Sequence, residues 1–260
     1  MREDQARGEM VEVGRRLYAR ALISGNEGNV SVRVGDALLV TPPGVCKGFL
    51  TPDMIVQTDL AGRPTDGRRA STEVLMHTAV YRRRPDAGAV VHAHPPVATG
   101  FAVAGLALDQ PLIAEAVVTL GKVPVIPYGT PSTAELADNV GAAVCQAQAL
   151  LLANHGALTV GDSLYRAWER MEALEQVAKI TLITRLLGVT NLLPATDVAR
   201  LIEMRPRAGY PEPVCATDGA PASTAARPAG PGPGGAADTV VLTRTELVRL
   251  VTEAVERFRH

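Results

Sequence analysis

The sequence has no long apolar run, no apolar segment at its N-terminus and no excess of charge of either sign. No run approaches the roughly 18 apolar residues that a membrane-spanning helix needs, so a membrane protein is not expected. The first five residues are mostly charged where a secretory signal has an apolar core, which favours a cytoplasmic protein. The net charge is −1 and there is no basic stripe, so we expect no nucleic-acid partner.

Cysteine is also scarce. Cys46, Cys145 and Cys215 are odd in number and far apart in the chain. They form no Cys-x-x-Cys pair that could hold a structural metal and no framework of paired cysteines. The sequence therefore predicts reduced, mostly buried thiols.

The composition divides the chain into three segments. Residues 1–215 have the mixed composition of a folded domain, and 47% of the whole chain is hydrophobic. Residues 216–238 are almost entirely Ala, Pro, Gly and Ser, which cannot bury a core and which predict a disordered linker. Apolar residues recur with helical spacing in the final segment, residues 239–260.

Hydrophobic periodicity and turn residues predict an α/β or α+β domain with a largely antiparallel sheet. The expected helices cover residues 3–23, 72–84, 132–146 and 163–187, and the expected strands cover residues 30–34, 37–41, 55–60, 88–93, 123–127 and 149–154. The first two strands form a hairpin around Gly35 and Asp36. Three consecutive arginines, Arg82 to Arg84, close the second helix, where cations complement the helix dipole, and we expect them to be solvated.

Two of the five histidines, His92 and His94, follow an apolar run that predicts a strand. Side chains at i and i+2 of a strand point to the same face, so the two imidazoles suit one metal ion. His155 follows another apolar run and precedes a glycine. Three neutral imidazoles leave a fourth position open, as in catalytic zinc sites, whereas a His-x-His pair alone is equally consistent with packing or surface exposure.

A carboxylate that could serve such a metal site is Glu73, in Ser71-Thr72-Glu73. Ser71 is a plausible N-cap, so Glu73 could simply be an acid that complements the helix dipole. Beside a metal, the same carboxylate could move protons at an activated carbon. His77, one helical turn later, is a further candidate ligand, although a core or pocket-lining role is favoured.

Five motifs then occur in one order: Gly28-Asn29-Val30-Ser31-Val32-Arg33, Thr41-Pro42-Pro43-Gly44, Ser71-Thr72-Glu73, His92-Ala93-His94-Pro95 and Asn154-His155-Gly156. Over roughly residues 5–210 this combination resembles the class II aldolase family of the L-fuculose-phosphate aldolase type. The resemblance implies a three-layer α/β/α fold around a mainly antiparallel sheet. It also implies a homotetramer whose active sites lie between subunits.

The same resemblance assigns roles to residues. It implies zinc on His92, His94 and His155, with Glu73 as the catalytic acid and base. It further implies a phosphate pocket, which would be formed by Gly28, Asn29, Gly44, Ser71 and Thr72.

Three positions bear on how closely the chain follows this family. Pro43 stands where the family usually has a hydroxyl residue, which removes one donor to phosphate. Ile113 replaces a tyrosine near the aldehyde end of the family's site, which leaves the choice of aldehyde open. Tyr210 matches the family's C-terminal tyrosine, which reaches the site of a neighbouring subunit, or it is an ordinary surface tyrosine.

The resemblance implies cleavage of a phosphorylated ketose substrate, a ketose 1-phosphate of the fuculose or rhamnulose type, to dihydroxyacetone phosphate and a small aldehyde. Ribulose-phosphate 4-epimerases and methylthioribulose-phosphate dehydratases resemble the same family and remain alternatives. A non-enzymatic interaction module is a third class, and the intact set of three histidines and Glu73 argues against it.

The final segment has its own pattern. Thr243 and Glu246 have the spacing of a capping box, and an apolar stripe follows, made of Leu247, Leu250, Val251, Ala254, Val255 and Phe258. A helix on such a linker resembles the encapsulation peptides that bind shell or cargo proteins of bacterial microcompartments. The alternative is that this helix folds back onto the enzyme. Basic and acidic residues are balanced in the final segment, which disfavours attachment to a membrane.

Overall fold

The structure is a computed structural model that describes residues 2–216, Glu246 and Arg249. Nearly all of the expected linker, 216–238, and of the expected helix, 239–260, lies outside the described residues, and both stay predictions. In the part that is described, no helix is long and apolar enough to cross a membrane.

The fold is built on one seven-stranded sheet with the order β3-β2-β1-β4-β7-β6-β5. The strands are β1 (Asn29–Val34), β2 (Ala37–Val40), β3 (Val56–Asp59), β4 (Ala89–Ala93), β5 (Val125–Ile126), β6 (Ala149–Leu152) and β7 (Gly156–Gly161). Every neighbouring pair is antiparallel except β5 and β6. The expectation of a largely antiparallel sheet is therefore confirmed.

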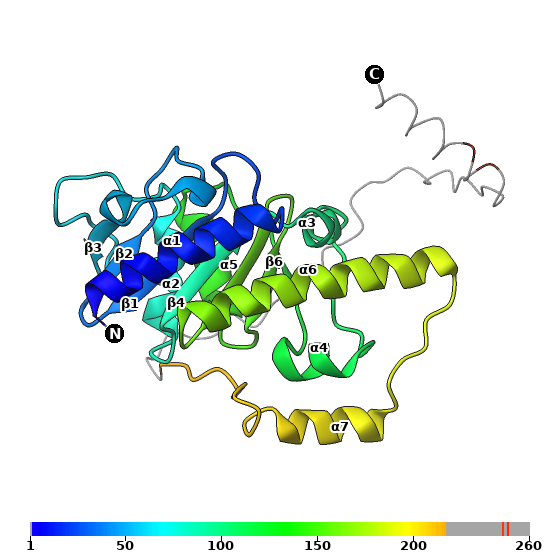
Figure 1. The fold of residues 1–260 in the computed structure, drawn as a ribbon. Coiled ribbons are helices and arrows are strands. Elements are labelled where there is room, and N and C mark those ends of the chain that lie inside the picture. The colour runs from blue at the N-terminus through cyan, green and yellow to red at the C-terminus, as the bar shows by residue number, and fades with distance from the viewer. Residues whose placement is uncertain (1, 217–245, 247–248, 250–260) are drawn as a thin grey trace. The chain divides into compact units, whose positions relative to one another are not determined.

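Helices cover both faces of the sheet, which confirms the three-layer α/β/α architecture (Figure 1). The helices are α1 (Glu3–Ala19), α2 (Val74–Arg83), α3 (Pro96–Val103), α4 (Ala114–Thr119), α5 (Ala134–Ala143), α6 (Leu164–Leu187) and α7 (Ala195–Met204), with short 3-10 helices η1 (Lys47–Phe49) and η2 (Pro52–Met54). One apolar core joins the sheet to α1, α3, α4 and α6, and a second joins it to α2 and α5.

Strand β4 lies in the middle of the sheet and is buried on both faces. Val91 belongs to the core on the α1 and α6 side, whereas Val90 belongs to the core on the α2 and α5 side. Because strand side chains alternate, His92 shares the face of Val90 and points toward the layer that contains α2. This alternation positions the first histidine of the candidate site.

Besides the short 3-10 helices, the sequence-based expectation lacks three α-helices, α3, α4 and α7, and one strand, β7. Strand β7 is buried on both faces and so lacks the alternation that marks a strand. Helix α3 begins with Pro96, directly after Pro95, and contains Gly100, and α4 has only six residues. Such short or atypical segments give weak periodic signals. Helix α7 is different, because its apolar residues Val198, Leu201 and Ile202 do have helical spacing, so the sequence contained a signal there.

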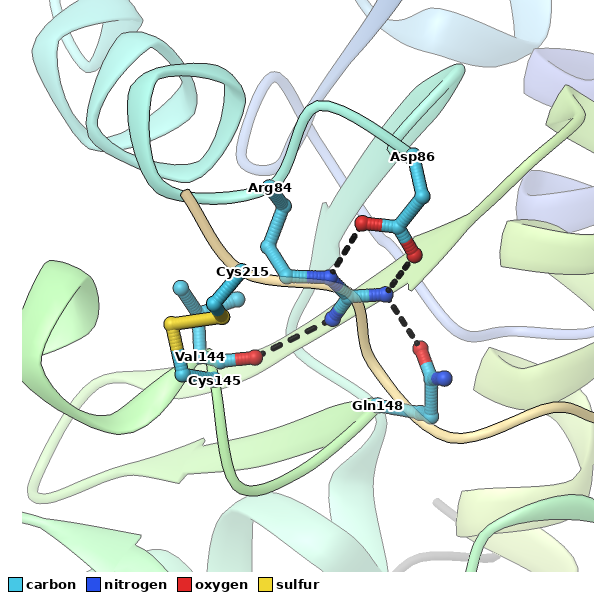
Figure 2. The surroundings of a disulfide bond; sticks show 6 residues. All are labelled: Arg84, Asp86, Val144, Cys145, Gln148 and Cys215. Carbon is cyan, nitrogen blue, oxygen red and sulfur yellow. Dashed lines mark hydrogen bonds and ion pairs between the residues drawn. A yellow bond between two sulfur atoms is a disulfide. The ribbon is translucent and has the colours of Figure 1, made fainter. Parts of the chain in front are cut away.

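The expectation of three reduced thiols is wrong. Cys145, just after α5, and Cys215, in the segment after α7, form a disulfide, and only Cys46 is a free cysteine (Figure 2). The two half-cystines are 70 residues apart in sequence, but their Cα atoms lie 5.8 Å apart. Proximity of this kind arises from the packing of the domain and leaves no local trace in the sequence.

Arg84 is also not solvated as expected, because its residue is only 2% exposed. Its guanidinium pairs with both carboxylate oxygens of Asp86 at 2.8 Å and donates to the Val144 carbonyl and the Gln148 side chain (Figure 2). Gln148 in turn donates to the Pro211 carbonyl. Arg84 therefore joins the end of α2 to the region of the disulfide, and these hydrogen bonds compensate its burial.

Candidate active site

The three predicted histidines converge at one end of neighbouring strands. His92 lies on β4, His94 directly follows β4, and His155 lies in the turn between β6 and β7. Strands β4 and β7 pair so that Ala93 faces Ala157, which brings that turn beside the end of β4. One ligand atom from each of the three histidines lies within 4.8 Å of the others.

The turn that carries His155 has special backbone requirements. Asn154 has a φ of 54°, a left-handed conformation that asparagine tolerates better than most residues. At Gly156 an added Cβ would lie 2.5 Å from the His94 ring and 2.7 Å from the Ala93 carbonyl. Glycine is therefore needed there for His94 and His155 to approach each other.

The rings are arranged as metal ligands would be. The centroid of His92 lies 4.9 Å from that of His94 and 4.7 Å from that of His155. His92 Nδ1 donates to the Ala157 carbonyl at 2.8 Å, which leaves the Nε2 lone pair free, and that Nε2 lies 3.1 Å from His94 Nε2. Burial lowers the pKa of His92 to about 3 and also lowers the pKa of His94, so both rings are neutral.

These observations test whether a metal fits. A ligating histidine typically donates its second ring nitrogen to a backbone carbonyl, as His92 does. His92 Nε2, whose lone pair is free, lies 3.1 Å from His94 Nε2, so the two rings direct nitrogens to one place, and His155 offers a third nearby. The residues present therefore fit a divalent metal with three imidazole ligands, although they do not identify the element.

Glu73 joins this cluster from the helix layer that contains α2. It occupies the N-cap position of α2, one residue before the helix begins, rather than the expected first turn. Its carboxylate lies 3.2 Å from His155 Nε2 and 3.4 Å from His92 Nε2. Burial alone would raise the pKa of Glu73, but the close approach of His155 and the hydrogen bond from the Asn29 amide outweigh it and hold that pKa below its usual range.

A buried chain of hydrogen bonds orients Glu73. Asn29 Nδ2 donates to Glu73 Oε2 at 2.7 Å, so Asn29 Oδ1 is left to accept from His77 Nε2. His77 Nδ1 then accepts from the Ser31 hydroxyl at 2.6 Å, and Ser31 accepts from the Tyr81 hydroxyl at 2.8 Å. Burial lowers the pKa of His77 to about 4, which keeps the ring neutral, as this direction of donation requires. His77 thus supports the carboxylate and is not a metal ligand.

A cavity of about 220 Å³ adjoins Glu73 and His94. All five residues of the expected phosphate pocket line it, together with residues that the sequence did not indicate: Asn26, Glu27 and Lys47. Gly28 and Gly44 have φ values of +72° and +69°, and a Cβ at Gly28 would lie 2.8 Å from the His92 carbonyl. Only glycine fits there without strain, which explains the position of Gly28 in the motif.

The other singled-out positions lie outside this cluster. Tyr210 is mostly buried, and its hydroxyl donates to Glu169 at 2.8 Å while the Arg166 guanidinium lies over its ring. Ile113 packs partly buried against the core at the start of α4. Pro43 does line the cavity, so the missing hydroxyl is a property of the pocket itself.

Comparison with known proteins agrees with this geometry. Residues 8–182 match the family model described as the class II aldolase and adducin N-terminal domain. The chain is 36% identical over 206 residues to a 3-oxo-tetronate 4-phosphate decarboxylase of Pectobacterium atrosepticum, an alignment that covers 76% of this chain and 93% of that protein.

Two further relatives are aldolases by name. An L-fuculose phosphate aldolase of Methanococcus maripaludis is 35% identical over 178 residues, with 67% of this chain and 95% of that protein covered. The crystal structure of l-fuculose-1-phosphate aldolase from Thermus thermophilus superposes with a TM-score of 0.66 at 38% identity, covering 74% of this chain and all of the other. The named relatives thus share a fold but not one reaction.

Proposed function

The chain belongs to the class II aldolase family, and on that premise we propose that it cleaves a ketose 1-phosphate to dihydroxyacetone phosphate and a small aldehyde. The observation that carries the proposal is the convergence of three imidazoles and Glu73 beside a cavity that glycines and hydroxyl residues line. A carbon–carbon lyase needs one place to hold the anionic group and another to hold the reacting oxygens, and the two adjoin here.

His92, His94 and His155 would hold the metal, which we propose to be zinc. When bound, such an ion supplies positive charge that stabilises the enediolate left by the departing aldehyde. The histidines themselves are positioned by strand pairing, and His92 is oriented by its bond to the Ala157 carbonyl.

We assign the proton transfers to Glu73. Cleavage breaks the bond between the α and β carbons of the ketone. The β-hydroxyl group loses its proton as it becomes the aldehyde carbonyl, and the electron pair of the broken bond remains on the α carbon, which stays with the phosphate fragment. That carbon must then receive a proton, and the Glu73 carboxyl group is the titratable acid nearest to the histidines. The chain from Asn29 to Tyr81 keeps the carboxylate in one orientation, so little reorganisation is needed when the proton moves.

A decarboxylase is the second candidate. The Pectobacterium relative carries that name and is aligned over 93% of its length. The two reactions share their central chemistry, because loss of carbon dioxide from a 3-oxo acid also leaves an electron pair beside a ketone. They differ in the leaving fragment, which is an aldehyde in one case and carbon dioxide in the other.

The test is to incubate the metal-loaded protein with a panel of ketose 1-phosphates, ribulose 5-phosphate, methylthioribulose 1-phosphate and phosphorylated 3-oxo acids. Release of dihydroxyacetone phosphate with an aldehyde would support the aldolase. Release of carbon dioxide would support the decarboxylase, whereas epimerisation or loss of water, with every carbon–carbon bond left intact, would contradict both.

We further propose a homo-oligomer, a tetramer by family resemblance, whose sites are completed between subunits. The supporting observation is an apolar surface on α3 and α6, where a cavity of about 400 Å³ adjoins exposed leucines and isoleucine near the end of α6. Tyr210 is proposed to act in a neighbouring subunit's site. Light scattering tests this, because a strictly monomeric and fully active enzyme would contradict it.

For residues 239–260 we propose binding to shell or co-packaged proteins of a bacterial microcompartment. The support is the apolar stripe in the sequence alone. A fluorescent reporter fused to these residues should co-purify with shells, and the Leu250→Glu, Val251→Glu version should not. Equal recovery of both would refute the targeting role, and loss of lyase activity on truncation at residue 215 would favour a helix packed on the enzyme.

A further inference from the structure

A lysine is buried at the edge of the proposed phosphate cavity. Lys47 is only 2% exposed, although lysine is among the residues least often buried. It begins η1, which packs against α1 so closely that a Cβ at Gly14 would lie 2.2 Å from the Lys47 carbonyl oxygen. The backbone of Lys47 is therefore held in place, and its side chain lines the cavity.

The ammonium group of Lys47 is incompletely paired. It donates one hydrogen bond, to the carbonyl of Asn26, which lines the same cavity. Among residues 2–216 no carboxylate lies within 4.0 Å of it and no second acceptor is recorded, so two of its three donors are available. Burial lowers the pKa of Lys47 below its ordinary value, and the opposing effects of Cys46 and of the Glu27 and Glu73 carboxylates do not offset it.

A buried, incompletely paired cation costs stability unless an anion compensates it. The same cavity offers the left-handed glycines Gly28 and Gly44 and the hydroxyl residues Ser71 and Thr72, all suited to phosphate oxygens.

We propose that Lys47 is a specificity-determining residue that binds the phosphate monoester of the substrate and replaces the hydroxyl donor missing at Pro43. This rests on the proposed function for the identity of the substrate, but not for the presence of the anion site.

Glu27 gives the proposal a second, opposite test. Its carboxylate lines the same cavity and is held by the backbone amide and the hydroxyl of Ser24. A fixed negative charge beside the anion opposes phosphate binding, whereas the Lys47 charge favours it. Removing the two charges should therefore change phosphate affinity in opposite directions. A purely structural lysine predicts no such pattern.

The experiment titrates inorganic phosphate into the metal-loaded full chain by calorimetry. Hydrogen bonds to charged groups contribute about 1.5–3 kcal/mol, so Lys47→Met should weaken phosphate binding about 10- to 100-fold. Lys47→Arg should retain most of the affinity, and Glu27→Gln should tighten it. The matched control is Lys122→Met, which removes an exposed lysine outside the cavity and should leave binding unchanged.

Unchanged phosphate affinity in Lys47→Met would overturn the proposal, and so would weaker binding in Glu27→Gln. If Lys47→Met does not fold, the phosphate affinities of Lys47→Arg and Glu27→Gln still test the proposal. Because the readout is binding and not turnover, an inactive protein whose phosphate affinity depends on Lys47 would contradict the proposed reaction and leave the anion site supported.

Discussion

Removing the Cys145–Cys215 disulfide should destabilise the domain without altering its active site. The bond connects the end of α5 to the segment after α7, and neither cysteine lines the candidate cavity. The variant to test carries both Cys145→Ser and Cys215→Ser, so that no unpaired thiol remains where the disulfide was. Reducing the disulfide of the wild-type chain removes the same cross-link by an independent method.

The size of the effect follows from the loop that the disulfide closes. The cysteines are 70 residues apart, and in the chain-entropy model closing a loop of that length stabilises the folded state by about 4 kcal/mol at 25 °C. In a domain of about 200 residues, 1 kcal/mol shifts the melting temperature by about 2–4 °C. The melting temperature should therefore fall by about 8–16 °C.

The assay is thermal unfolding followed by circular dichroism, with and without reductant. The double serine variant and the reduced wild type should melt together, and reductant should not affect the variant. Oxidised wild type, reduced wild type and variant melting at one temperature would refute the reasoning. Lyase activity at 25 °C should be equal in all three, because Arg84 still bonds Val144 and Gln148, and Gln148 still bonds the Pro211 carbonyl in the segment after α7.

Three further predictions concern the candidate site. Glu73→Gln preserves shape but removes the base, so turnover should fall about 10²- to 10⁴-fold with metal content unchanged, and near-normal turnover would exclude Glu73 from the mechanism. His92→Ala and His155→Ala should each lose nearly all bound metal in elemental analysis, whereas His77→Gln should keep it; full occupancy in the alanine variants would remove the metal site. Neutral His77 should also make stability depend on pH. Its folded pKa of about 4 lies below the ordinary 6.5, so its contribution is complete above pH 6.5 and is lost as the pH falls toward 4, by up to about 1.4 kcal/mol per pH unit. Urea unfolding of metal-free protein at pH 7 and pH 5 measures this, and an equally steep loss in His77→Gln would contradict it.

Local sequence was sufficient to predict part of the geometry of the candidate site. The alternation of a strand places His92 and His94 on one face, and the structure brings both within ligand distance of His155. The spacing of apolar residues likewise predicted α1, α2, α5 and α6, and the first hairpin, to within a few residues. These features depend on residues close together in the chain, whose geometry the backbone repeat determines by itself.

Only the tertiary structure decided which distant segments meet. Nothing in the local sequence marks Lys47, and Arg84 was expected to be solvated at the end of a helix. The packing of α1 and of the segment after α7 nevertheless buries both. The pairing of Cys145 with Cys215 and the line of hydrogen bonds from Tyr81 to Glu73 arise in the same way. Burial and long-range pairing depend on the whole fold, because a side chain's surroundings come from residues far away in the chain, and no local period encodes them.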